Sequence, residues 1–160
     1  MSIVPALGAN ALLRRGQGQD AAQQLANVER AAAQIALIAA ELPAHQFVIT
    51  HGNGPQAGLL ARELQADVLL IATDVPALDQ DWGLPSQRAL DDVSTAQLRA
   101  MRFAAGSMAP KVAAACDFVE LTGRRAVIGS LDQTEAMLRG DGGTQITGVI
   151  RRVTHTENDP

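Results

Sequence analysis

The sequence is poor in aromatic side chains and in cysteine. Its 160 residues include one tryptophan, three phenylalanines and no tyrosine, although 47% of the residues are hydrophobic. The core must therefore consist of small and aliphatic side chains packed between helices and a sheet. The single cysteine, Cys116, excludes a disulfide within the chain and fits a reducing compartment. Because Cys116 lies in an alanine-rich segment, we expect it to be a buried packing residue rather than a nucleophile.

Basic stretches and long apolar runs are also missing. The net charge is −4, and no basic stretch is longer than an arginine pair, which argues against nucleic acid as the main partner. No apolar run is long enough to span a bilayer, and no signal-peptide pattern opens the chain. We therefore expect a cytoplasmic protein with no membrane partner. Its length suits one domain, which we place at residues 1–150, followed by a polar tail at 151–160.

Lysine is almost absent, because Lys111 is the one lysine among 13 basic residues. It follows Pro110 in the first turn of a predicted helix, where a cation opposes the helix dipole. A bound phosphate would supply the missing negative charge at this position. The alternative is a lysine that points into solvent, which would cost only roughly a few tenths of a kcal/mol.

The most informative stretch of the sequence is 47–74. An apolar run, Phe47–Thr50, leads into the turn His51–Pro55, a helical pattern starts at Gln56, and a second apolar run, Val68–Ala72, ends at Thr73–Asp74. This order predicts a right-handed crossover unit with two parallel strands. Ligands of such units bind beyond the carboxyl ends of the strands, and both polar clusters lie there.

The turn His51–Pro55 has the composition of an anion-binding loop. Gly52 and Gly54 permit positive φ and leave no Cβ between the backbone and a ligand. Pro55 suits the first helical turn, and the free N–H groups that follow carry the positive end of the helix dipole. A plain glycine-rich turn remains the alternative, since short Gly-x-Gly turns are common.

The remaining patterns predict an α/β fold, a three-layer αβα sandwich with a mainly parallel sheet. The first strand covers 2–7, and its Pro5 places it at a sheet edge or distorts it locally. A helix at 21–42 follows, with Asp20 as N-cap and an apolar stripe of Leu25, Val28, Ala32, Ile35, Ile38, Ala39 and Leu42. Further helices are expected at 95–103, 111–122 and 132–139, and further strands at 126–128 and 144–150. The irregular segment 75–92 is either a lid or nucleotide-flanking loop, or a surface hairpin with Trp82 against a helix.

Several segments together resemble the carbamate kinases of the amino acid kinase superfamily. They are LGANALL at 7–13, VITHGNGPQAGLL at 48–60, TDV at 73–75, FAAGSMAPKVAAACDFVE at 103–120 and GT at 143–144. The resemblance implies a shortened amino acid kinase fold, because family members carry a large middle section directly after the HGNGPQ motif. In this chain the join falls inside a helix, near Gly58–Leu60.

The resemblance also implies a reaction, phosphoryl transfer between ATP and carbamate that forms ADP and carbamoyl phosphate, with ATP or ADP and Mg²⁺ as cofactors and no metal-ligating residues assigned in the chain. The implied roles fall into three sets: Gly8, Asn10, Gly52 and Asn53 at the carbamate and the transferred phosphate; Thr73, Asp74, Met108 and Pro110 at the nucleotide; and Lys111 at its terminal phosphates.

The chain departs from the family pattern at positions that matter for catalysis. Two family lysines have no counterpart, Ala9 and Ala109 replace glycines, and Leu84 replaces a lysine. Loss of one oxyanion donor typically costs ~10²–10³ in rate, so turnover should be near background. Three alternatives stay open: an impaired phosphotransferase, a non-catalytic remnant that binds nucleotide or phosphate, and a scaffold. Since a deletion within a sheet exposes strands, we also expect a homodimer or larger homo-oligomer.

Overall fold

The structure is a computed structural model that describes residues 1–8, 21–41, 46–51 and 55–148. Its strands and helices follow one another in the order β1 (Ser2–Leu7), α2 (Ala21–Glu41), β2 (Gln46–Phe47), β3 (Thr50–His51), α3 (Pro55–Glu63), β4 (Val68–Thr73), β5 (Leu78–Gln80), β6 (Arg88–Leu90), β7 (Asp92–Ser94), α4 (Thr95–Ala100), α5 (Met108–Thr122), β8 (Arg125–Ser130), the 3₁₀ turn η1 (Leu131–Gln133), α6 (Thr134–Arg139) and β9 (Thr144–Thr147).

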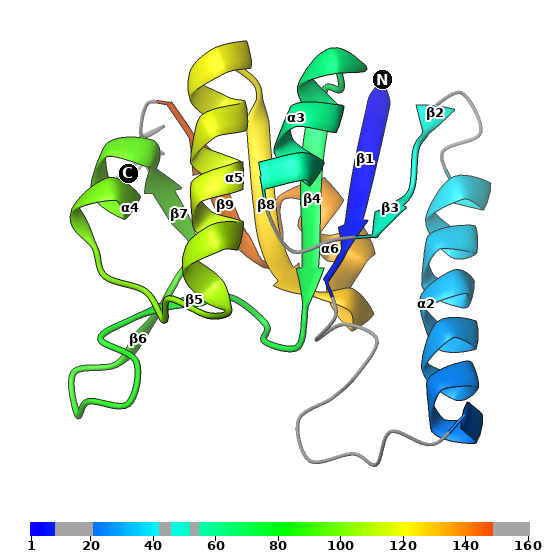
Figure 1. The fold of residues 1–160 in the computed structure, drawn as a ribbon, viewed down its shortest axis with the longest axis horizontal. Helices are drawn as coiled ribbons and strands as arrows, with labels where there is room; N and C mark the ends of the chain where they lie inside the picture. Colours follow the sequence, from blue (N-terminus) through cyan, green and yellow to red (C-terminus); the bar gives the residue numbers. More distant parts are fainter. Residues whose placement is uncertain (9–20, 42–45, 52–54, 149–160) are drawn as a thin grey trace, which may run out of the picture.

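The main sheet has the strand order β2-β1-β4-β8-β9-β7, and β3 also pairs with β1 (Figure 1). The pairs β1–β2, β1–β3, β1–β4 and β4–β8 are parallel, whereas β9 runs antiparallel to β8. The predicted crossover unit from β3 through α3 to β4 is present, with β1 lying between its two strands. A separate antiparallel hairpin, β5–β6, projects beyond the sheet.

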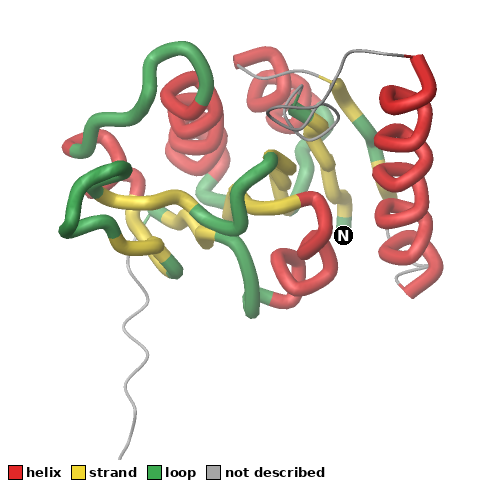
Figure 2. Tube along the Cα trace, turned by 90° about the horizontal axis from the view of Figure 1, so that it is seen from below, coloured by secondary structure: helices red, strands yellow, loops and turns green. Residues whose placement is uncertain are grey.

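Helices cover both faces of the sheet, which confirms the predicted three-layer αβα architecture (Figure 2). The alternation along β4 decides which residues face which layer. Leu69 and Ile71 pack with residues of α3 and α5, whereas Val68 and Leu70 pack with residues of α2 and α6. Since every residue of β4 is buried, the strand reads as a continuous apolar run, as expected for a parallel strand covered on both sides.

The first strand is interior, so of the two alternatives for Pro5 the sheet edge is excluded and the local distortion remains. β1 lies between β4 and the short strands β2 and β3. The distortion that this proline causes appears in the neighbouring segment of the sheet, between β2 and β3. Val48 N–H donates to Ile3 O at 3.1 Å, and the next bond of this parallel ladder would need an N–H at residue 5. Because proline has none, pairing stops after Phe47 and resumes at Thr50.

The long helix α2 confirms the predicted bounds, but its apolar stripe was only partly right. Ile35 and Ile38 are buried, together with Asn27 and Ala31, while Leu25 and Val28 of the predicted stripe are exposed. The helix turns a narrow face toward Ile3 and Leu7 of β1, since it lies beside the end of the sheet. The stripe was predicted from apolar spacings of three and four, and spacing does not show how much of a helix the sheet covers.

The segment 75–92 is a hairpin rather than an irregular excursion. Leu78 pairs with Leu90, Asp79 with Ala89 and Gln80 with Arg88. Trp82 lies at the tip and is 63% exposed, so it is not packed against a helix as the hairpin alternative assumed. The short strand β7, which follows directly, was missed because three residues give no periodic signal.

Helix α4 is short, its N-terminus is capped, and it is hydrogen-bonded to α5 through side chains. Ser94 caps it in a reciprocal capping box with Gln97. Arg99 donates to Glu120 and Asp117 of α5, and these bonds raise the pKa of Arg99 and lower that of Glu120. In the described parts of the chain, no helix combines the length and hydrophobicity needed to cross a membrane.

Candidate functional site at the carboxyl edge of the sheet

Several of the predicted site residues meet where the parallel strands end, the edge that faces the viewer in Figure 2. Gly8 follows β1, and its N–H donates to Ala72 O at 3.2 Å, which places it beside the last residues of β4. Thr73 ends β4, is 1% exposed, and donates from Oγ1 to Asp74 Oδ1 at 3.1 Å. The Asp74 side chain is half-buried and so remains accessible from the loop side.

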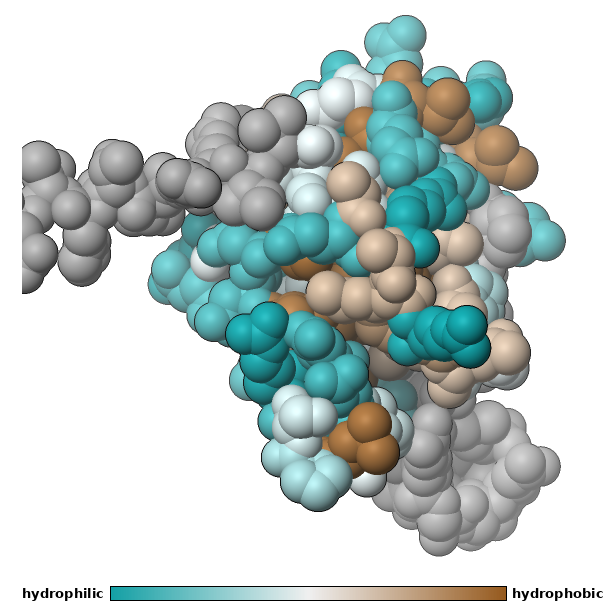
Figure 3. All heavy atoms as spheres, turned by 90° about the vertical axis from the view of Figure 1, so that its left-hand side faces the viewer, coloured by the Kyte–Doolittle hydropathy of each residue, from teal (hydrophilic) through white to brown (hydrophobic). Residues whose placement is uncertain are grey.

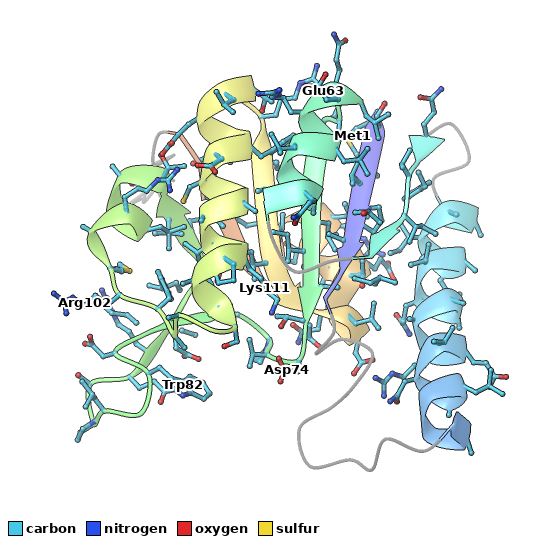
Figure 4. All side chains as sticks on the ribbon, viewed as in Figure 1. Met1, Glu63, Asp74, Trp82, Arg102 and Lys111 are labelled. Atoms are coloured by element: carbon cyan, nitrogen blue, oxygen red, sulfur yellow. The ribbon has the colours of Figure 1, made fainter. Side chains whose placement is uncertain are left out.

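Lys111 lies at the same end of the molecule, in helix α5, which packs on one face of the sheet. It lies in the first turn of α5, as predicted, and Figure 4 shows it close to the end of β4 that bears Asp74. Its side chain does not point into solvent, because Lys111 is only 1% exposed and Nζ donates to Ser107 O at 3.3 Å. A fully buried lysine is rare outside paired or functional sites, so the solvent alternative is excluded.

The start of α5 differs from an open anion-binding helix terminus. The N–H groups of Ser107, Met108 and Ala109 all donate to Ala104 O, at 3.3, 3.1 and 3.0 Å. Pro110 has no N–H to offer. These donors are therefore already satisfied within the chain, and the positive group that this helix start can offer a phosphate is the Lys111 ammonium.

A pocket of about 920 Å³ opens next to these residues. One wall is the β5–β6 hairpin, the other is the connection from α4 to α5, and its floor is the chain just after β4. Figure 3 shows the face with α4 and the hairpin, where moderately apolar side chains lie between strongly polar ones. The lining residues are Asp74, Val75, Ala77, Asp79, Gln80, Asp81, Trp82, Leu84, Ala100, Met101, Arg102, Phe103, Ala104, Ser107 and Met108.

The pocket contains only some of the residues predicted for the nucleotide. Asp74 and Met108 line it, whereas Thr73, Pro110 and Lys111 do not. Sequence reasoning missed the wall formed by Met101 and Phe103, because Met101 lies outside the motifs and no role was assigned to Phe103 at the start of the segment 103–120. Asn10, Gly52 and Asn53, predicted for the carbamate and the transferred phosphate, lie outside the described residues.

The charged groups of the pocket are mainly acidic, since Asp74, Asp79 and Asp81 face one arginine, Arg102. An unaccompanied polyphosphate would be repelled here, whereas a nucleotide that carries a divalent cation would not. Within the described residues, no group of three or more His, Cys, Asp or Glu side chains could hold a metal ion by itself. A cation at this site would therefore depend on phosphate oxygens for much of its coordination.

Cys116 lies in α5 and takes no part in the pocket. It is fully buried, and this burial raises the pKa of its thiol to about 11. The thiol therefore stays protonated at neutral pH and is a poor nucleophile. The expectation that Cys116 is a packing residue agrees with this geometry.

Comparison with known proteins identifies relatives of the chain. The model of the amino acid kinase family matches residues 57–130. The carbamate kinase of Rhizobium meliloti is 44% identical over 102 residues, which are 63% of this chain and 32% of the relative. The carbamate kinase of Haemophilus influenzae is 47% identical over 91 residues, 57% of this chain and 29% of the relative. The chain thus spans about a third of the length of these relatives.

Solved structures extend the likeness over almost the whole chain. The carbamate kinase from Giardia lamblia bound to AMP-PNP superposes with a TM-score of 0.82 and 21% identity, and the match spans 92% of this chain and 98% of that one. A structural match that reaches both ends of a carbamate kinase, beside sequence matches to a third of the length, fits a fold that lacks an inner section. The chain is thus similar to the amino acid kinase family over residues 57–130, similar in sequence to carbamate kinases over about 60% of its length, and similar to them in fold.

Proposed function

We propose that the chain binds a magnesium nucleotide in the 920 Å³ pocket and is an impaired phosphotransferase of the carbamate kinase type. The observation that carries this proposal is the buried Lys111 ammonium beside the carboxyl end of β4, next to a pocket that Met101, Phe103 and Met108 line with apolar surface. In parallel α/β sheets this is the edge at which ligands bind. The AMP-PNP bound to the Giardia relative supports the choice of a nucleotide.

The residues of the pocket suit the different parts of such a ligand. Met101, Phe103 and Met108 offer an apolar surface for a base. Lys111 would bind the terminal phosphate oxygens, and Gly8 leaves room for their approach because it has no side chain. Asp74 would orient water or cation around the phosphates. Bound Mg²⁺ would neutralise charge on the phosphates and so favour their binding beside the acidic side chains.

The same residues explain why we expect weak turnover. Phosphoryl transfer depends on positioned cationic and N–H donors, and each lost donor typically costs ~10²–10³ in rate. Lys111 is the one lysine of the chain, and the first N–H groups of α5 are bonded to Ala104 O. Carbamate and carbamoyl phosphate remain the proposed substrates, with a rate far below that of an intact catalytic set.

The test is a calorimetric titration with MgADP followed by an assay of ATP formation from MgADP and carbamoyl phosphate. We expect saturable MgADP binding and ATP formation close to the rate without protein. Full turnover would contradict the impairment, and absence of MgADP binding would contradict the nucleotide assignment. A titration with ADP and EDTA controls for the cation, and should give weaker binding because the pocket is acidic.

A second role, self-association, is favoured by one specific observation. Helix α3 packs through Ala57, Gly58 and Ala61 but exposes Leu59 and Leu60. Three further apolar side chains are exposed outside the helix: Leu64, directly after it, and Val48 and Ile49, between β2 and β3. We propose that these side chains are covered in a homodimer or larger homo-oligomer.

Multi-angle light scattering at micromolar concentration tests the self-association. We expect a mass of at least two chains, and Leu60→Gln together with Leu64→Gln should shift it toward one chain because apolar contact area is lost. A monomer in the unmodified protein would contradict this role without affecting the nucleotide assignment.

A further inference from the structure

The hairpin that walls the pocket is hydrogen-bonded to the main sheet at its base, through Leu78 and Leu90. Asp79, Gln80, Asp81, Trp82 and Leu84 line the pocket, and residues 81–89 are all exposed. Within the hairpin, Arg88 donates to Gln80 Oε1 and Ser86 donates to Asp81. These bonds keep the hairpin folded on itself but do not fix its direction. That direction must be set where Leu78 and Leu90 meet the sheet.

One hydroxyl group joins both strands of the hairpin at this base. Thr144 Oγ1 accepts from Leu78 N–H at 2.8 Å and donates to Leu90 O at 2.6 Å. The three residues are buried, and Thr144 is 0% exposed. Both bonds are therefore made away from water, where the loss of a partner is costly. Thr144 is the first residue of β9, so it ties the hairpin directly to the main sheet.

The backbone around Thr144 is held in place by two glycines. Gly143 has φ +68°, and a Cβ there would lie 2.9 Å from Met137 Cγ and 3.0 Å from Ile128 O. A Cβ on Gly129 would lie 2.9 Å from both Gly143 Cα and Pro76 O. Pro76 belongs to the link between β4 and the hairpin. Because these backbones touch without side chains between them, the Thr144 hydroxyl has a fixed position relative to the end of β4.

We propose that Thr144 is a positioning residue that holds the β5–β6 hairpin as a wall of the pocket and thereby supports ligand binding there. The nature of the ligand, a magnesium nucleotide, rests on the proposed function. The role of the Thr144 hydroxyl does not rest on the proposed function, because the hydroxyl holds the hairpin whether the pocket is empty or filled. Thr144 touches neither ligand nor reacting atoms in this proposal.

The test compares Thr144→Val, which keeps the shape and removes the hydroxyl, with Thr144→Ser, which keeps the hydroxyl. Amide hydrogen exchange without ligand should be faster by about tenfold or more at Leu78 and in residues 79–90 of the valine variant, as expected when a buried bond is lost. The amides of β4 and β8 should stay protected, which shows that the fold persists. MgADP affinity should fall by about tenfold in the valine variant and be restored in the serine variant.

Each outcome decides the proposal. If exchange and MgADP affinity are unchanged in Thr144→Val, or if serine does not rescue them, Thr144 has no positioning role. A looser hairpin with unchanged affinity would show that the hairpin does not support binding. If the unmodified chain does not bind MgADP, the proposed function fails, and the exchange comparison alone decides whether Thr144 holds the wall. If the valine variant does not fold, amide exchange in the unmodified chain decides instead. A Leu78 amide that exchanges faster than the amides of β8 would overturn the proposal.

Discussion

Replacing Lys111 by methionine is expected to weaken MgADP binding by about a hundredfold, because a charge-assisted bond to phosphate is worth roughly 1.5–3 kcal/mol. Methionine keeps the length and apolar stem of the side chain, which is 1% exposed and packed at the start of α5. The free energy of unfolding should be unchanged or higher, since a buried charge replaced by an apolar group of similar volume is often neutral or stabilising. Calorimetry and thermal unfolding measure the two effects.

Arg88→Met is the matched control for this substitution. Arg88 lies on the exposed side of the hairpin, where it donates to Gln80, and it does not line the pocket. The Arg88→Met substitution removes one positive charge, as Lys111→Met does, but keeps the Lys111 ammonium that we propose to bind phosphate. Equal loss of MgADP affinity in both variants would mean that only the net charge matters, and the specific role of Lys111 would be wrong.

Gly58→Ala is expected to lower the free energy of unfolding by about 2 kcal/mol, within the usual range for overpacking. A Cβ on Gly58 would lie 2.8 Å from Ala114 O, a backbone atom of α5 that cannot move as a side chain would. The two helices would have to separate, although alanine itself favours the helix by roughly 1 kcal/mol. The melting temperature should fall by about 4–8 °C, as measured by calorimetry.

Gly106→Ala serves as the control for Gly58→Ala. Nothing lies within 4 Å of a Cβ built on Gly106, and its φ is not in the left-handed region. Its stability should stay within about 0.5 kcal/mol of the unmodified chain. A similar loss in both variants would show that the close approach of α3 and α5 is not what glycine provides at position 58.

The sequence allowed the central unit and α5 to be predicted nearly in full. Apolar runs, glycines and prolines placed β4, Pro55 at the start of α3, and the end of α5 at Thr122. These features are set by neighbouring residues, so a local pattern contains them. The effect of Pro5 could not be placed in this way, because the missing N–H of β1 interrupts the pairing of Val48, a residue far along the chain.

The candidate site was predictable only where it coincides with motifs. Asp74, Met108 and Lys111 lie in or beside the pocket region, as their motifs suggested, while their roles in binding and catalysis remain predictions. The hairpin wall was not recognised as part of a pocket. Its position depends on the bond between Leu78 and Thr144, 66 residues apart, and such a contact leaves no periodicity in either segment.

The place of Trp82 has a practical consequence for future work. It is the one tryptophan of the chain and it lines the pocket from the tip of the hairpin. Its indole emission therefore reports on this wall alone, with no second indole to subtract. Ligand entry could be timed in a stopped-flow instrument on the unlabelled protein, and the same signal would show whether the wall moves before or after the ligand arrives.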